Sequence, residues 1–136
     1  MKVLIIGMNP SAVQPGSTVT GRKNSTFDRL YRWMDKLQIE RFSFTNCFHE
    51  AGDTKKLSAD ERSFLLTCAR GYDIVLSLGG FAHQNLKKLN IESFKLPHPS
   101  PRNRALNSSE FEARELDRCN TYIMEKMHDK ESLNYR

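Results

Sequence analysis

Cysteine is scarce in this chain of 136 residues, and the scarcity argues against several kinds of protein. The three cysteines, Cys47, Cys68 and Cys119, are odd in number and far apart, and they form no Cys-x-x-Cys pair. We therefore expect neither a disulfide framework nor a metal or cluster site held by cysteines. We also expect no other cofactor. The pattern favours three small core residues.

Long apolar runs are also missing, so no segment has the length and composition of a transmembrane helix. The apolar stretch in residues 1–7 is too short for a signal peptide. It is followed by Gly7-Met8-Asn9-Pro10 rather than by a small-residue cleavage site. We expect a cytoplasmic protein that does not bind membranes, with one domain spanning residues 1–136.

Positive charge is in surplus. Lysine and arginine number 21 against 16 acidic residues, which gives a net charge of +5 and an isoelectric point of about 9.2. A basic surplus favours a polyanionic partner such as nucleic acid, although many basic proteins bind none.

Apolar, β-branched segments alternate with segments of helical spacing. The segments that favour strands cover about residues 2–8, 42–48, 73–78 and 92–96, and the charges in the last favour a sheet edge. The expected helices begin near Ser25, at a Ser58-x-x-Glu61 capping box, after Gly79-Gly80 and at a Ser109-x-x-Glu112 capping box. The last helix is expected to fray after Met127. This alternation predicts an α/β fold, a three-layer α/β/α sandwich with a mostly parallel four-stranded sheet.

Ligands of such sheets bind beyond the carboxyl ends of the strands. Four loops are expected there, over residues 9–24, 46–57, 79–80 and 97–107. They carry much of the basic charge, namely Arg22, Lys23, Lys55, Lys56, Arg102 and Arg104. The predicted edge therefore suits an anionic ligand.

Two loop segments narrow the prediction: Gly7-Met8-Asn9-Pro10 and His98-Pro99-Ser100-Pro101-Arg102-Asn103. In this order, each after a strand, they resemble the two active-site motifs of the uracil-DNA glycosylase superfamily. The likeness is greatest to the single-strand-selective monofunctional branch, which pairs Gly-Met-Asn-Pro-Gly with His-Pro-Ser-Pro-Arg-Asn. The resemblance implies a compact glycosylase fold and an enzyme of DNA repair that flips a base and hydrolyses its glycosidic bond.

The resemblance also implies roles for three residues. Asn9 would position the attacking water, and His98 would donate a hydrogen bond to the base O2 as negative charge develops there. Asn46, at the end of the second expected strand, would meet N3–H and O4 of uracil and reject cytosine, whose donors and acceptors are reversed.

Further positions match the DNA-binding and base-binding parts of the family. Arg102 would fill the gap left by the flipped base, which offsets an unstacking cost of roughly a few kcal/mol. Ser100 would contact a phosphate through its hydroxyl or its backbone N–H. The remaining expected DNA contacts are Pro101, Asn103, Arg104, Arg22 and Lys23.

The base pocket is expected to include Met8, Ser11 and Phe27. Ser11 stands where some uracil-specific relatives carry a bulky tyrosine, so we expect tolerance of a 5-substituted uracil such as 5-hydroxymethyluracil. Phe27 suits either stacking on the base or packing in the core, because it falls at the helical spacing of a buried face. Trp33 is expected to pack, and His49 and His83 to be surface or capping residues.

Two alternatives remain. One is a DNA-binding or modified-base-binding member of the same fold with weak or no activity. The other is a small nucleotide- or nucleoside-processing α/β enzyme. This second alternative needs a phosphate-binding glycine-rich loop or acidic metal ligands, but Gly79-Gly80 is too short and no acidic cluster follows the strands. We expect a monomer in either case.

Overall fold

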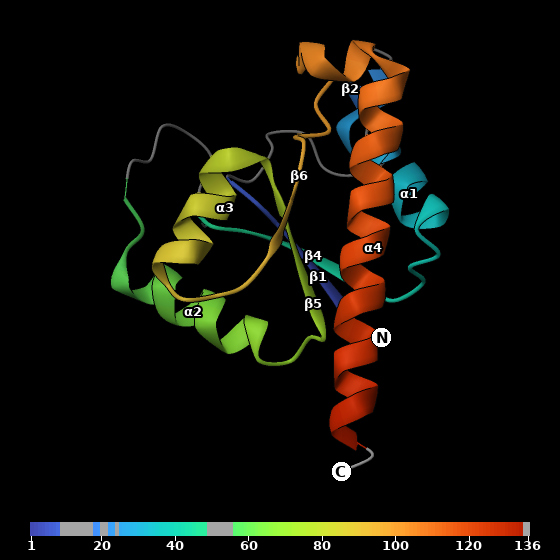
Figure 1. The fold of residues 1–136 in the computed structure, drawn as a ribbon. Helices are drawn as coiled ribbons and strands as arrows, with labels where there is room; N and C mark the ends of the chain where they lie inside the picture. Colours follow the sequence, from blue (N-terminus) through green and yellow to red (C-terminus); the bar gives the residue numbers. More distant parts are fainter. Residues whose placement is uncertain (9–17, 20–21, 24, 49–55, 135–136) are drawn as a thin grey trace.

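The structure is a computed structural model that describes residues 1–8, 18–19, 22–23, 25–48 and 56–134. Its centre is a four-stranded sheet with the order β4-β1-β5-β6, in which every pair of neighbours is parallel (Figure 1). The parallel four-stranded sheet predicted from the sequence is confirmed.

The strands are β1 (Val3–Gly7), β4 (Phe42–Asn46), β5 (Ile74–Leu78) and β6 (Phe94–Leu96). All five residues of β1 and of β5 are buried because these strands are central and covered on both faces. The sixth strand lies at an edge, as its charged residues predicted, and is shorter than expected.

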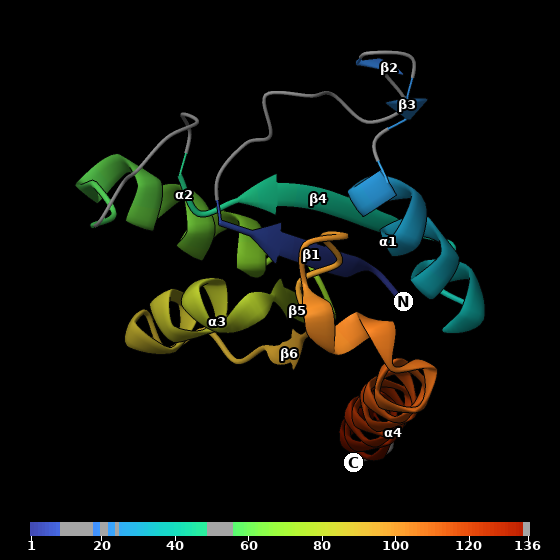
Figure 2. The same cartoon turned by 90° about the horizontal axis from the view of Figure 1, so that it is seen from above.

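Two helices cover each face of the sheet, as Figure 2 shows. The helices α1 (Ser25–Lys36) and α4 (Ser109–Asn134) lie on one face, and α2 (Ala59–Ala69) and α3 (Gly79–Lys88) on the other. The three-layer α/β/α arrangement predicted from the sequence is therefore present.

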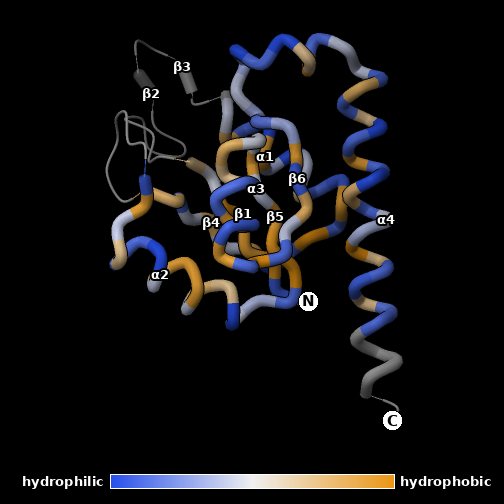
Figure 3. The backbone as a smooth tube through the Cα atoms, turned by 60° about the vertical axis from the view of Figure 1, so that its left-hand side comes forward, coloured by the Kyte–Doolittle hydropathy of each residue, from blue (hydrophilic) through white to orange (hydrophobic). Residues whose placement is uncertain are grey.

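Alternate residues of β1 point into two separate cores, since side chains of a strand alternate between faces. Val3 and Ile5 join the α1/α4 core, which also contains Trp33, only 1% exposed, so its predicted packing role is confirmed. Leu4 and Ile6 join the α2/α3 core. Figure 3 shows the hydrophobic strands at the centre of the more hydrophilic helices.

The capping box predicted for α2 is confirmed. The backbone N–H of Glu61 donates to Ser58 Oγ (3.1 Å), and the backbone N–H of Ser58 donates to a Glu61 carboxylate oxygen (2.9 Å). This reciprocal pair satisfies two N–H groups that a helix start leaves without partners.

Other helix bounds differ from the predictions. The residue that caps α4 is Ser108, whose Oγ accepts from the backbone N–H of Phe111 (3.2 Å), so the capping box predicted at Ser109 is wrong by one residue. Helix α4 also continues to Asn134 instead of fraying after Met127. Ser25 is the first residue of α1 rather than the residue before it.

Two short elements were not anticipated. A two-stranded antiparallel sheet, β2 (Thr18–Val19) with β3 (Arg22–Lys23), interrupts the segment expected to be a loop. A 3-10 helix, η1 (Arg104–Asn107), ends the loop that follows β6. No helix in the described part of the chain is long and apolar enough to span a membrane.

Candidate functional site

The carboxyl ends of β1 and β4 lie side by side. Gly7 is the register partner of Asn46. Beyond them, the backbone N–H of Cys47 donates to the Gly7 carbonyl (2.9 Å), and that of Phe48 donates to the Met8 carbonyl (2.9 Å). These bonds hold the start of the first motif against the chain that carries Asn46. Asn9 itself lies outside the described residues.

The Asn46 carboxamide lies directly against Gly7. A Cβ atom built on Gly7 would stand 2.9 Å from Asn46 Oδ1 and 3.2 Å from Phe44 Cζ, closer than side-chain atoms normally approach. Only a glycine allows this contact. The Asn46 side chain is half-buried, so part of it is open to a ligand.

The ring of Phe44, which is part of this contact, packs against the ring of Phe27. Phe27 belongs to the α1/α4 core, is 8% exposed and meets the Phe44 ring edge-on, with centroids 5.2 Å apart and planes at 74°. Of its two predicted roles, packing is the one that these contacts describe, and stacking on a base stays a prediction. The sequence reasoning missed Phe44. Its position two residues before Asn46, on the same face of the strand, was the available signal.

The Met8 side chain packs against the α2/α3 core, on the opposite side of the sheet from Phe44. A contact between Met8 and a base would therefore come from its backbone. That contact stays a prediction.

His98 stands two residues beyond β6, next to the turn from β5 into α3. Gly79, in that turn, has a φ of +84°, and a Cβ built on it would lie 3.7 Å from His98 Cβ. Pro99 is buried, which anchors the loop beside the ring. Asn46 ends β4 and His98 follows β6, so both lie at the carboxyl end of the parallel sheet. They belong to its two opposite edge strands, with β1 and β5 between them, roughly 14 Å or three strand spacings apart across the sheet.

The hydrogen bonding of His98 selects one form of its ring. The backbone N–H of Ser100 donates to His98 Nδ1 (3.1 Å), so Nδ1 is an acceptor and the proton of the neutral ring is on Nε2. Although the residue is exposed overall, neighbouring protein atoms partly desolvate the ring and lower the pKa of His98 below its ordinary 6.5. At neutral pH, Nε2 is therefore a hydrogen-bond donor on an uncharged ring.

The loop after His98 is braced from within. The Asn103 amide donates to the His98 carbonyl (3.0 Å), and Asn103 Oδ1 accepts from the backbone N–H of Ala105, capping η1 (3.2 Å). Ser100 Oγ accepts from the backbone N–H of Arg102 (3.2 Å). Asn103 thus has a structural role here, while its predicted contact with DNA stays a prediction.

These bonds also limit how the loop can contact a ligand. The backbone N–H of Ser100 is occupied by His98, so a phosphate contact is left to its hydroxyl. Pro101, Arg102 and Arg104 are exposed, so they are accessible to a polyanion.

Several predicted positions lie outside what the structure describes, including Ser11, Lys55 and His49. Arg22 and Lys23 form β3, but their side chains are not described. Lys56 is exposed. The described residues contain no group of three or more His, Cys, Asp or Glu side chains that could hold a metal ion.

His83 lies inside α3, so it does not cap the helix, and it is partly exposed at the surface with hydrogen-bond partners. Its Nδ1 lies 3.3 Å from Ser77 Oγ and 3.2 Å from Ser93 Oγ, in a polar cluster between α3 and the sheet. This cluster is separate from the residues around Asn46 and His98.

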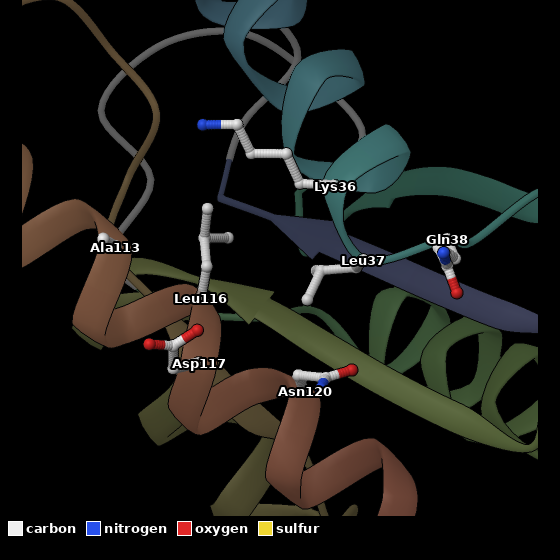
Figure 4. Close-up of a pocket in the computed structure, with 7 residues that line it drawn as sticks. All are labelled: Lys36, Leu37, Gln38, Ala113, Leu116, Asp117 and Asn120. Atoms are coloured by element: carbon white, nitrogen blue, oxygen red, sulfur yellow. The ribbon is translucent and has the colours of Figure 1, made fainter.

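The hollow in Figure 4 has a volume of about 390 Å³ and lies between the end of α1 and the first half of α4. Its lining residues are Lys36, Leu37, Gln38, Ala113, Leu116, Asp117 and Asn120. None of the predicted site residues lines this hollow, so it does not bear on their chemistry.

Comparison with known proteins shows the family of the chain. The model of the uracil DNA glycosylase superfamily matches residues 1–122, which is most of the chain and includes both motifs. A search of curated proteins finds no match.

Proposed function

We propose that this chain, which belongs to the uracil-DNA glycosylase superfamily, is a monofunctional enzyme that excises uracil or a 5-substituted uracil from DNA. Its motifs favour the single-strand-selective branch. The observation that carries the proposal is the hydrogen bond from Ser100 N–H to His98 Nδ1, because it leaves Nε2–H of a neutral imidazole free to donate.

That donor suits the departing base. When the bond between C1′ and N1 breaks, its electron pair stays with the base, and the negative charge spreads to O2. A hydrogen bond from His98 Nε2 to O2 strengthens as this charge grows, which stabilises the transition state more than the ground state. A water held by Asn9 then bonds to C1′, and its proton is released.

Base recognition falls to Asn46. With the base extruded, Asn46 Oδ1 accepts from N3–H and its amide donates to O4. Cytosine presents an acceptor and a donor at these positions and is rejected. No lysine or cysteine nucleophile is required, so the enzyme leaves an intact abasic strand.

The exposed loop after His98 supports binding to DNA. Arg102 fills the gap left by the base, Pro101 and Arg104 contact the strand, and the Ser100 hydroxyl contacts a phosphate. Arg22 and Lys23 add positive charge. Affinity for DNA therefore falls steeply as salt concentration rises.

Serine is smaller than the tyrosine that some uracil-specific relatives carry at the position of Ser11. We expect the enzyme to cut 5-hydroxymethyluracil as well as uracil. Cleavage of uracil without cleavage of any 5-substituted analogue would contradict this part of the proposal.

The test uses a labelled oligonucleotide with a single uracil, single-stranded and duplex, treated with alkali after incubation. Alkali-dependent cutting that Asn9→Ala and His98→Ala both abolish is the expected result. Cutting before alkali would refute monofunctional chemistry. No cutting of uracil or 5-substituted uracils, with salt-dependent DNA binding retained, would favour a non-catalytic binder instead.

A further inference from the structure

Three residues crowd the point where β1 and β4 end. Asn46 Oδ1 and the Phe44 ring both occupy the space that a side chain on Gly7 would need: Phe44 Cζ and Cε2 lie 3.2 Å and 3.6 Å from that Cβ position. The tip of the ring and the carboxamide therefore converge over the same bare backbone atom.

The ring cannot easily withdraw from this contact. Phe44 packs against the α1/α4 core, where Phe27 meets it edge-on. The backbone of β4 is held along its whole length by pairing with β1. The carboxamide oxygen and the ring thus share the space over Gly7, and the ring is backed by the core.

Confinement matters because the terminal torsion of asparagine is broad. Rotation of the carboxamide by half a turn exchanges its oxygen and its nitrogen. The side chain would then offer a donor to N3–H and an acceptor to O4, which uracil cannot match. The identity of the base that is read depends on holding one orientation.

We propose that Gly7 and Phe44 form a seat that positions the Asn46 carboxamide, so that Phe44 is a positioning residue for base recognition. The inference rests on the proposed function. Neither residue needs to touch the base. Both act through Asn46.

The test compares Phe44→Leu and Gly7→Ala with matched controls. Phe42→Leu makes the same change on the same strand face, two residues earlier, where the ring neighbours Tyr31 rather than Gly7. Gly71→Ala adds a methyl group whose nearest neighbour outside the adjacent residues, the Cys68 carbonyl oxygen, would lie at an ordinary 3.6 Å. Melting temperatures show that each variant is folded.

Two quantities are measured: the single-turnover excision rate on a uracil oligonucleotide, and the affinity for the same oligonucleotide with a stable abasic analogue. Phe44→Leu and Gly7→Ala should each slow excision about ten-fold or more, while affinity for abasic DNA changes less than two-fold. The controls should excise at the wild-type rate. In an Asn46→Ala background, Phe44→Leu should cause no further loss, because the residue through which it acts is gone.

The outcomes separate the two proposals. If the wild-type chain cuts no uracil, the proposed function fails. If the wild type cuts and Phe44→Leu and Gly7→Ala match their controls, only the seat is refuted. A full ten-fold loss from Phe44→Leu in the Asn46→Ala background would also refute the seat, since the effect would then not pass through Asn46.

Discussion

Two histidines near β6 both use Nδ1 within the protein, but with different partners: a backbone N–H for His98 and serine hydroxyls for His83. His98 follows the strand, and its Nδ1 accepts from the Ser100 backbone, so Nε2 carries the proton and is left for a ligand. His83 lies between α3 and the sheet, and its Nδ1 points into a pair of serines.

The hydroxyls around His83 do not select one form of its ring, because a hydroxyl can both donate and accept. Ser77 Oγ donates to the Phe94 carbonyl (3.3 Å) and lies 3.1 Å from Ser93 Oγ. A backbone N–H can only donate, so the form of the His98 ring is set by Ser100. Burial is the largest cause of the lowered pKa of both rings, so the pKa does not distinguish them. The partner of Nδ1 does.

The largest expected effect comes from replacing each of the two histidines by alanine. His98→Ala should lower the uracil excision rate by roughly 10²–10³-fold with little change in melting temperature, because it removes a donor to the developing anion. His83→Ala should keep the rate within a few-fold but destabilise the fold by about 1 kcal/mol, because Ser77 and Ser93 lose a hydrogen-bond partner. Excision rates and denaturant unfolding of both variants check this. A greater rate loss from His83→Ala would reverse the assignment.

A smaller effect is expected from removing the Asn103 hydrogen bonds that brace the loop after His98. Asn103→Ala removes the bond to the His98 carbonyl and the cap of η1, so the ring is held less well, and excision should slow about ten-fold. Ser58→Ala removes an equivalent cap at α2, far from His98, and should cost about 1 kcal/mol of stability without slowing excision. Equal excision rates in the two variants would show that the brace has no catalytic consequence.

Removing one positive charge near His98 should change DNA binding, and removing one near His83 should not. Arg102→Ala should weaken DNA binding and reduce the slope of log affinity against log salt by about one, as for a lost phosphate-type contact. Lys87→Ala removes an exposed charge in the last turn of α3, near His83, and should leave that slope unchanged. Binding titrations at several salt concentrations measure both. A slope unchanged by Arg102→Ala would remove the loop from the DNA interface.

The smallest expected effect is on the pH dependence of stability. Because the pKa of His98 is lower in the folded state than its ordinary 6.5, the unfolded chain binds more protons between the two values. The contribution of His98 to the free energy of unfolding is fully present above pH 6.5 and is lost as the pH falls through the lowered pKa. Excision should decline in the same range, since protonating Nδ1 breaks the bond from Ser100. Unfolding curves from pH 7.5 to 4.5 should be flatter for His98→Ala than for the wild type, and parallel curves would contradict the assignment.

Much of the fold could be predicted because its signals are local. The apolar run at Val3 and the Ser58–Glu61 box specify a strand and a helix start within a few residues of themselves. The start of α4 was misplaced because Ser108 and Ser109 are equally good caps by type, and only backbone geometry selects the first. The β2–β3 pair was missed because two-residue strands have too few side chains to show a period.

Only part of the candidate site could be predicted, because some of its contacts join segments that are far apart in the sequence. Asn46 and His98 stand at or just after strand ends, where ligand-binding residues of such folds are expected, and the structure puts both at the carboxyl end of one sheet. Phe44 was missed because a phenylalanine within a strand is typical of a core residue, although it shares a strand face with Asn46. Its contact with Gly7 depends on the pairing of segments almost forty residues apart.

The sequence by itself determined the alternation of strands and helices, the basic charge and the two motifs, because composition, periodicity and capping act over short stretches of chain. Only the tertiary structure decided the strand order β4-β1-β5-β6, the partner of Nδ1 in each histidine, and the meeting of Gly7, Phe44 and Asn46. Those features arise from sheet pairing, loop hydrogen bonds and side-chain packing, whose partners are chosen in three dimensions.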